Sequence, residues 1–431
     1  MGKGKSGIEF AVVTAIAVGL AVLGAGDAVA APVCNGASIT GLGTTLQKHA
    51  QQSVLTPLFA SEICNKGSYP TVTYNLANSE AAMEEWNSDG KRGSINTAWQ
   101  FIGTDLPPTA SELESIDNVA GGANVVVIPV LQTSIAVIAN PPPGCVVEEI
   151  ANAKLASVFE GVTFSWPQLE TVWEEGEEGA CEAPITRVVP KGSSGVAYQF
   201  KNYLYQINNE GLACTEGATE GKATWQELES TSNGETGMPN TTWPEVCGEK
   251  ALSGLVRPAG TATSEVVNKV RNTAGSIGFA PLPDAVLNEA PTLLKLQNNG
   301  LVKLAKANYA EPTTESGRAN CYMRYDVPPG TAEGVDVDWS QVFGDELNIG
   351  GEEYPLCMLT YDLAFHGYES AGFSAEDEQT TRDYLAEYLV QTAGQKEFEG
   401  KHNHYSPLAS SPSESHDVLG AARKAAEKIT K

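Results

Sequence analysis

Residues 185–207, ITRVVPKGSSGVAYQFKNYLYQI, contain a strand, a loop and a helix in one stretch. The β-branched run over 185–189 predicts a buried strand, and the apolar spacing over 196–207 predicts a helix that packs on it. Small and hydroxyl residues lie between them, at 192–195. Because a helix start presents unpaired N–H groups and the positive end of the helix dipole, the stretch predicts an α/β fold with an anion-binding loop.

Two further segments have the same design. Residues 41–46, GLGTTL, open a predicted helix over 46–59, and residues 78–80, NSE, join a predicted strand over 72–74 to a predicted helix over 80–86. Each loop alone is also typical of an ordinary helix cap. Three such helix starts in one α/β chain predict an uncharged cage of N–H and hydroxyl donors for an anion.

A fourth segment, FIGTDLPP over 101–108, adds a carboxylate, Asp105. Hydrogen phosphate has a P–O–H group that can donate to a carboxylate, whereas sulfate has no proton and would be repelled by it. Asp105 therefore favours phosphate among the oxyanions. The alternative is that Asp105 only caps the turn at 106–108.

Composition limits the possible partners. The 431 residues include 53 acidic and 27 basic ones, for a net charge of -26. This balance argues against nucleic acid and anionic membrane surfaces as partners. Further strands are expected over 125–128 and 135–138, and further helices over 264–272, 374–392 and 418–429.

The N-terminus is typical of an export signal. Lys3 and Lys5 precede an apolar run over 10–26, and Ala28, Val29 and Ala30 form a small-residue cleavage site. An uncleaved anchor helix is the alternative, and the run is short for it. We expect residues 1–30 to be a signal peptide.

Eight cysteines fit an exported chain, because disulfides form in oxidising compartments. The sequence does not fix their connectivity. Pairing of neighbours is the simplest arrangement, and each bond would then contribute about 3–4 kcal/mol in the chain-entropy model. A metal site is the rival interpretation, but no C-x-x-C motif is present and the chain has five histidines. The neighbour pairs are Cys34 with Cys64, Cys145 with Cys181, Cys214 with Cys247, and Cys321 with Cys357.

In their order along the chain, these segments resemble those of the phosphate-specific ABC-transporter substrate-binding protein family, over residues 36 to 410. Four further stretches are similar to family landmarks: 155–169, 275–279, 354–356 and 405–408. The resemblance implies a two-lobed periplasmic-binding-protein-like fold of type II, in which each lobe is a mixed sheet flanked by helices and the ligand lies between the lobes. Lobe I would comprise 31–128 and 283–431, and lobe II would comprise 129–282.

The resemblance also implies a set of phosphate ligands. Asp105 would accept the phosphate proton, and the other residues would donate hydroxyl or N–H groups. They are Thr45, Leu46, Ser79, Ser194, Gly195 and Val196, with Thr44, Lys191 and Ser193 as possible additions. The chain departs from the family at Pro190, Gly192 and Val196, where the family has Arg, Asp and Thr. The loss of the Arg and its partner Asp together indicates a retuned or relaxed site.

The resemblance implies a bacterial protein without cofactor, monomeric and periplasmic, cell-surface or extracellular, that delivers phosphate to a membrane ABC permease. Two alternatives stay open: a relative with a degenerate site that acts as an exported sensor or surface protein, and a protein for another oxyanion, such as sulfate, molybdate or an organic phosphate. An enzyme is not expected, because no G-x-S-x-G elbow or metal motif accompanies the histidines. These are His49, His366, His402, His404 and His416.

Overall fold

The computed structural model describes most of the chain after the expected signal segment. The expected signal peptide, Cys214 and Cys247 lie outside the described residues. Within the part of the chain that is described, no helix has both the length and the apolarity of a membrane span. The described residues are 31–65, 70–87, 95–169, 172–173, 181–207, 241–243, 254–299, 307–321, 327–329, 337–340, 353–399 and 404–429.

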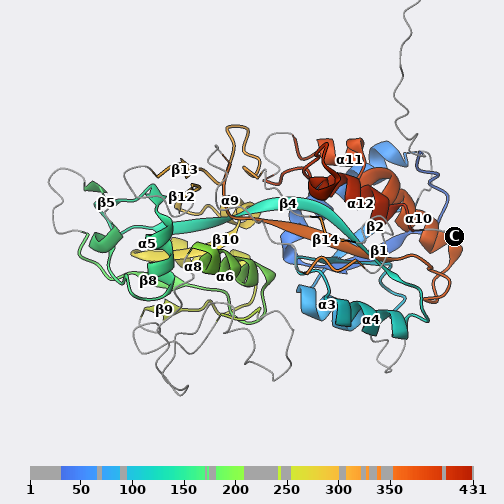
Figure 1. The fold of residues 1–431 in the computed structure, drawn as a ribbon, viewed down its shortest axis with the longest axis horizontal. Helices are drawn as coiled ribbons and strands as arrows, with labels where there is room; N and C mark the ends of the chain where they lie inside the picture. Colours follow the sequence, from blue (N-terminus) through green and yellow to red (C-terminus); the bar gives the residue numbers. More distant parts are fainter. Residues whose placement is uncertain are drawn as a thin grey trace, which may run out of the picture. The chain divides into compact units, whose positions relative to one another are not determined.

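The strands form a mixed sheet in which β4 changes partners midway (Figure 1). Its order is β2-β1-β3-β14-β4-β10-β8-β9, with β11 also paired to β4, and two small sheets lie beside it. The strands are β1 Ile39–Gly43, β2 Val72–Leu76, β3 Phe101–Thr104, β4 Val125–Asn140, β5 Cys145–Val146, β6 Glu149–Ile150, β7 Val172–Trp173, β8 Thr186–Val188, β9 Leu255–Val256, β10 Ser276–Pro281, β11 Thr292–Leu293, β12 Lys295–Gln297, β13 Tyr309–Ala310 and β14 Cys357–Phe365.

Helices pack against both parts of this sheet, for example α3 on β3, α12 on β4 and α8 on β10. The α-helices are α1 Lys48–Ala50, α2 Thr56–Leu58, α3 Ser79–Trp86, α4 Ala110–Val119, α5 Asn152–Phe159, α6 Gly195–Ile207, α8 Thr263–Arg271, α9 Leu282–Leu287, α10 Ala375–Tyr384, α11 Thr392–Lys396 and α12 Val418–Ala426. Shorter 3-10 and π turns are η1 Thr45–Gln47, η2 Gln51–Leu55, η3 Phe59–Ile63, η4 Trp166–Leu169, η7 Leu385–Leu389 and η8 Glu414–His416.

The prediction of separate strands over 125–128 and 135–138 is wrong, because both belong to the 16-residue strand β4. Its residues up to Ser134 pair with β14, and its residues from Ile135 pair with β10. Two hydrophobic cores are present. One lies around β1, β3 and β14 and also includes Val188 of β8 and the buried side of α8, and the other lies around α5, α6 and the Ile277 and Phe279 side chains of β10. Within each part, parallel and antiparallel pairs occur together, as expected for two mixed sheets.

Most predicted helices are present with shifts of a few residues at their ends. The prediction of one helix over 374–392 is correct at its start, where Ser374 and Asp377 form a capping box. Its expected end is wrong, because the chain passes into η7 and breaks at Gln391 before α11 begins. The sequence has no Gly or Pro at this break, so the usual stop signals are missing there.

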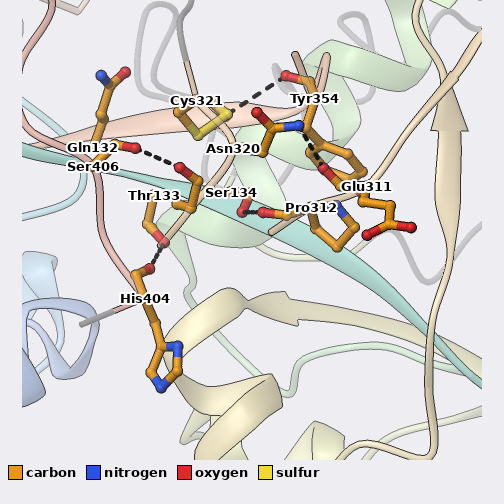
Figure 2. The surroundings of a disulfide bond; sticks show 12 residues. Gln132, Thr133, Ser134, Glu311, Pro312, Asn320, Cys321, Tyr354, His404 and Ser406 are labelled. Carbon is orange, nitrogen blue, oxygen red and sulfur yellow. Dashed lines mark hydrogen bonds between the residues drawn. A yellow bond between two sulfur atoms is a disulfide. The ribbon is translucent and has the colours of Figure 1, made fainter. Parts of the chain in front are cut away.

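Three of the four predicted disulfides fall within the described residues, and all three are present: Cys34 with Cys64, Cys145 with Cys181, and Cys321 with Cys357. Their Cα–Cα distances are 5.5, 5.4 and 6.0 Å, within the usual range for disulfides. The third bond joins Cys321 to Cys357, the first residue of β14, which pairs with Ser134 where β4 changes partners (Figure 2). There the Ser134 hydroxyl donates to the Pro312 carbonyl (2.7 Å) and the Thr133 hydroxyl donates to the His404 carbonyl (3.0 Å).

Candidate anion-binding site

Thr44 lies where β1 ends and η1 begins. Its hydroxyl oxygen accepts the Leu46 N–H (3.2 Å), which caps the helical turn, and its hydroxyl donates to Asp105 Oδ2 (3.3 Å). The Tyr74 hydroxyl donates to the Thr44 carbonyl (3.3 Å), so the adjacent strand β2 fixes this corner. The junction thus presents a positioned hydroxyl at the carboxyl end of its strand.

Ser79 is the first residue of α3, the helix after β2. Asn78 caps this helix by accepting the Ala81 N–H (2.7 Å). The Ser79 hydroxyl donates to Asp105 Oδ1, and the Asp105 N–H donates back to Ser79 Oγ (3.1 Å). Two hydroxyls from separate helix starts therefore meet on one carboxylate.

Asp105 follows β3 and is only 6% exposed. Burial raises the pKa of its carboxyl, and the hydrogen bonds from Ser79, its own backbone and Thr44 partly offset that rise. The carboxyl also lies directly against Gly195, the first residue of α6: a Cβ added there would be 2.6 Å from Asp105 Cγ. A carboxyl held so closely to a helix start is placed to share a proton with a ligand bound at the same point.

These residues line a cavity of about 240 Å³. Seven residues predicted from the sequence share its wall: Thr44, Thr45, Ser79, Asp105, Ser193, Ser194 and Gly195. Three others lie elsewhere. The Leu46 and Val196 side chains are buried in a hydrophobic core, and the Leu46 N–H is bonded to Thr44. The Lys191 ammonium donates to the Ala259 carbonyl (2.9 Å) and does not line the cavity.

Among the cavity's described lining residues, Asp105 is the one ionisable side chain. Arg187 is buried, 3% exposed, and donates to the Phe159 carbonyl (3.3 Å). Burial lowers its pKa to about 10. Arg257 donates to the Trp243 carbonyl (3.3 Å). The cavity therefore offers hydroxyls, helix starts and one carboxyl, a set that suits an anion carrying its own proton.

Residues 261–263 of the lining were not predicted from the sequence. Thr261 and Ala262 precede α8 and Thr263 is its first residue, after the short strand β9. The run GTATS over 260–264 has the same composition of small and hydroxyl residues before a helix as the three predicted loops. This composition could have identified the loop from the sequence. The start of α8 is thus a fourth helix start at this cavity.

Replacing Gly195 by Ala is expected to weaken phosphate binding by about tenfold or more. The new Cβ would lie 2.5 Å from Asp105 Oδ1, so the carboxyl would have to leave its bonds to Ser79 and Thr44. Titration calorimetry of the variant measures the change. Gly367→Ala is the matched control, because a Cβ there would meet only ordinary contacts, the nearest at 3.5 Å. Equal phosphate affinity in both variants would contradict this role for Gly195.

No protein-family model matches this chain, and no curated protein sequence matches it. Solved structures do match. A phosphate-binding protein from Stenotrophomonas maltophilia is similar with a TM-score of 0.55 and 19% identity, over 90% of this chain and 93% of that one. A high-affinity periplasmic phosphate-binding protein bound with phosphate has a TM-score of 0.56 and 17% identity, over 86% and 90%.

A human phosphate-binding apolipoprotein is similar with a TM-score of 0.55 and 18% identity, over 86% of this chain and 92% of that one. These three matches cover 86–90% of this chain and 90–93% of the other chains. At such low identity the likeness establishes architecture. The chain has the two-lobed α/β fold of these phosphate-binding proteins.

Proposed function

We propose that this chain is an exported phosphate-binding protein. The observation that carries the proposal is the meeting of the Thr44 and Ser79 hydroxyls on the buried Asp105 carboxyl, beside the start of α6. On binding, the two hydroxyls would turn from Asp105 and donate, with N–H groups of the helix starts, to the charged oxygens of hydrogen phosphate, which would donate its own proton to Asp105. The function is binding, and no residue is assigned a catalytic role.

The proposed ligands come from both lobes. Lobe I, residues 31–128 and 283–431, would supply Thr44, Thr45, Ser79 and Asp105. Lobe II, residues 129–282, would supply the start of α6 and the newly found Thr261–Thr263 turn. The change of partner in β4, from β14 up to Ser134 to β10 from Ile135, supports a division of the sheet close to this point. Closure of the lobes would bury the ligand.

Delivery to a membrane ABC permease is part of the proposal. The three disulfides suit an oxidising compartment outside the cytoplasm, which is where such a receptor works. The acidic chain, with a net charge of -26, would stay in solution near an anionic membrane surface.

Titration calorimetry of the mature protein, stripped of phosphate, tests the proposal. We expect micromolar or tighter phosphate binding and at least about 100-fold weaker sulfate binding, because sulfate has no proton to donate to Asp105 and is repelled by its charge. Equal binding of both anions would contradict the assigned role of Asp105. No binding of either anion by a folded sample would overturn the proposal itself.

A second candidate function is an exported sensor or surface protein that has kept the fold and lost the ligand. The observation that favours it is the composition of the cavity: none of its described lining residues is basic, and Pro190 and Gly192 stand where the resembled family has Arg and Asp. The same titration decides between the two candidates, because only the first requires phosphate binding.

A further inference from the structure

A second cavity, of about 420 Å³, adjoins the proposed phosphate cavity. The two share three lining residues, Thr45, Leu76 and Ala262, so a ligand in one can extend into the other. We propose that the site takes a monoester of phosphate with a small polyhydroxy group, whose phosphate occupies the first cavity and whose organic group occupies the second. This inference rests on the proposed function, since it assumes that the first cavity binds a phosphate group.

The walls of the second cavity are largely apolar. Two of them, Leu76 and Leu287, are 40% and 53% exposed and are among only five large hydrophobic side chains so exposed in the described residues. Leu46, Pro281 and Pro283 complete the apolar wall. Inorganic phosphate has no apolar surface to place against such side chains, whereas the C–H faces of a polyol do.

Polar groups are distributed over this apolar wall. Thr263, which lines the first cavity, donates to Asp284 Oδ2 in the second, so one hydrogen bond connects the two. Burial raises the pKa of Asp284, while the Thr263 bond and the charge of Lys48 lower it. The His49 ring stacks at 6.5 Å on the Tyr405 ring, and burial lowers its pKa.

These groups match the needs of hydroxyls. A carboxylate accepts from a hydroxyl, an ammonium donates to it, and a neutral imidazole does either. Lys48 and Asp284 have opposite charges, so together they favour an uncharged polar group over a second anion or a cation. The hydroxyls of Ser53 and Ser264 and the amide of Asn288 add further partners.

The phosphate group of the ester must still donate a proton to Asp105. A phosphate monoester loses its last acidic proton near a pH of about 6, and its monoanion can donate that proton to a carboxylate as hydrogen phosphate does. The comparison is therefore made at about pH 6, where a large part of the ester carries the proton.

Titration calorimetry would compare glycerol 3-phosphate with methyl phosphate, inorganic phosphate and glycerol. We expect glycerol 3-phosphate to bind at least about tenfold more tightly than methyl phosphate, because only its organic group reaches the second cavity. Glycerol alone would not bind measurably. In Ser53→Trp, whose indole would fill the second cavity from an exposed position, this tenfold gain is lost and methyl phosphate binds as before. Asn288→Ala reduces the gain without abolishing it.

Each other outcome overturns a specific claim. If inorganic phosphate binds and glycerol 3-phosphate binds no better than methyl phosphate, the inference is wrong and the proposed function stands. If the gain survives in Ser53→Trp, the organic group is not in the second cavity and the inference is wrong in its location. If no phosphate compound binds to the folded protein, the proposed function and the inference are both wrong.

Discussion

Replacing Asp105 by Asn is expected to lower the affinity for phosphate by about tenfold to 100-fold and to create measurable binding of sulfate. A carboxylate accepts the proton of hydrogen phosphate, whereas an amide N–H₂ can only donate in that direction. In the variant the amide N–H₂ can donate to a sulfate oxygen. The repulsion between sulfate and the carboxylate, which excludes sulfate from the wild-type site, is then absent. The Ser79 and Thr44 hydroxyls can rotate to keep a bond to the Asn side chain.

Calorimetry with both anions measures this change of selectivity. Asp377→Asn is the matched control, because it removes the same charge at the start of α10, away from the cavity lining. We expect it to leave both affinities unchanged. An Asp105→Asn protein that keeps its phosphate affinity and still rejects sulfate would show that Asp105 does not recognise the ligand's proton.

The part of the candidate site that follows β1, β2 and β3 could be predicted because these strands are neighbours. Thr44, Ser79 and Asp105 follow β1, β2 and β3, which are parallel neighbours in the order β2-β1-β3. The carboxyl ends of such strands meet at one edge of the sheet, so polar loops that follow them lie together. The structure brings these three residues together at that edge, and their role as phosphate ligands stays a prediction.

The strand β4 could not be predicted because its polar residues find distant partners. The run Gln132, Thr133 and Ser134 separates two apolar segments and is typical of a loop. In the structure the side chains of all three donate to backbone carbonyls of segments far along the chain, at Pro407, His404 and Pro312. Long-range bonds of this kind satisfy buried polar groups within a strand, and no local pattern reveals them.

The sequence also does not reveal that none of the cavity's described lining residues is basic. Three basic residues each donate to a main-chain carbonyl: Arg187 to Phe159, Lys191 to Ala259 and Arg257 to Trp243. Such contacts depend on how segments far apart in the chain fold together, which no local pattern reveals. The Thr261–Thr263 turn, by contrast, carried a readable signal, because its composition repeats that of the other three loops.

Asp362 is a buried carboxyl for which we expect a large effect on stability. It lies on β14, fully buried, and accepts a hydrogen bond from Gln51 (3.3 Å), while no partner is found for its Oδ1. Burial raises the pKa of Asp362 from 3.8 to about 7, against the opposing effect of hydrogen bonds from Gln47 and Gln51. The folded-state pKa thus exceeds the unfolded one, so the folded protein binds this proton more tightly.

The stability that this proton provides is complete below about pH 4 and is lost as the pH rises through about 7. A difference of about three pKa units corresponds to about 4 kcal/mol, as an order of magnitude.

Asp362→Asn keeps the shape of the side chain without its charge, so the free energy of unfolding of the variant relative to wild type should rise between pH 5 and pH 8 by up to about 2–3 kcal/mol. Urea unfolding at both pH values measures this difference, in which the titration of all other groups cancels. The same difference at both pH values would show that Asp362 does not change protonation between them. Gln47 and Gln51 follow Thr44 and Thr45 directly in the chain. A charged Asp362 would therefore destabilise the same segment that positions these proposed phosphate ligands.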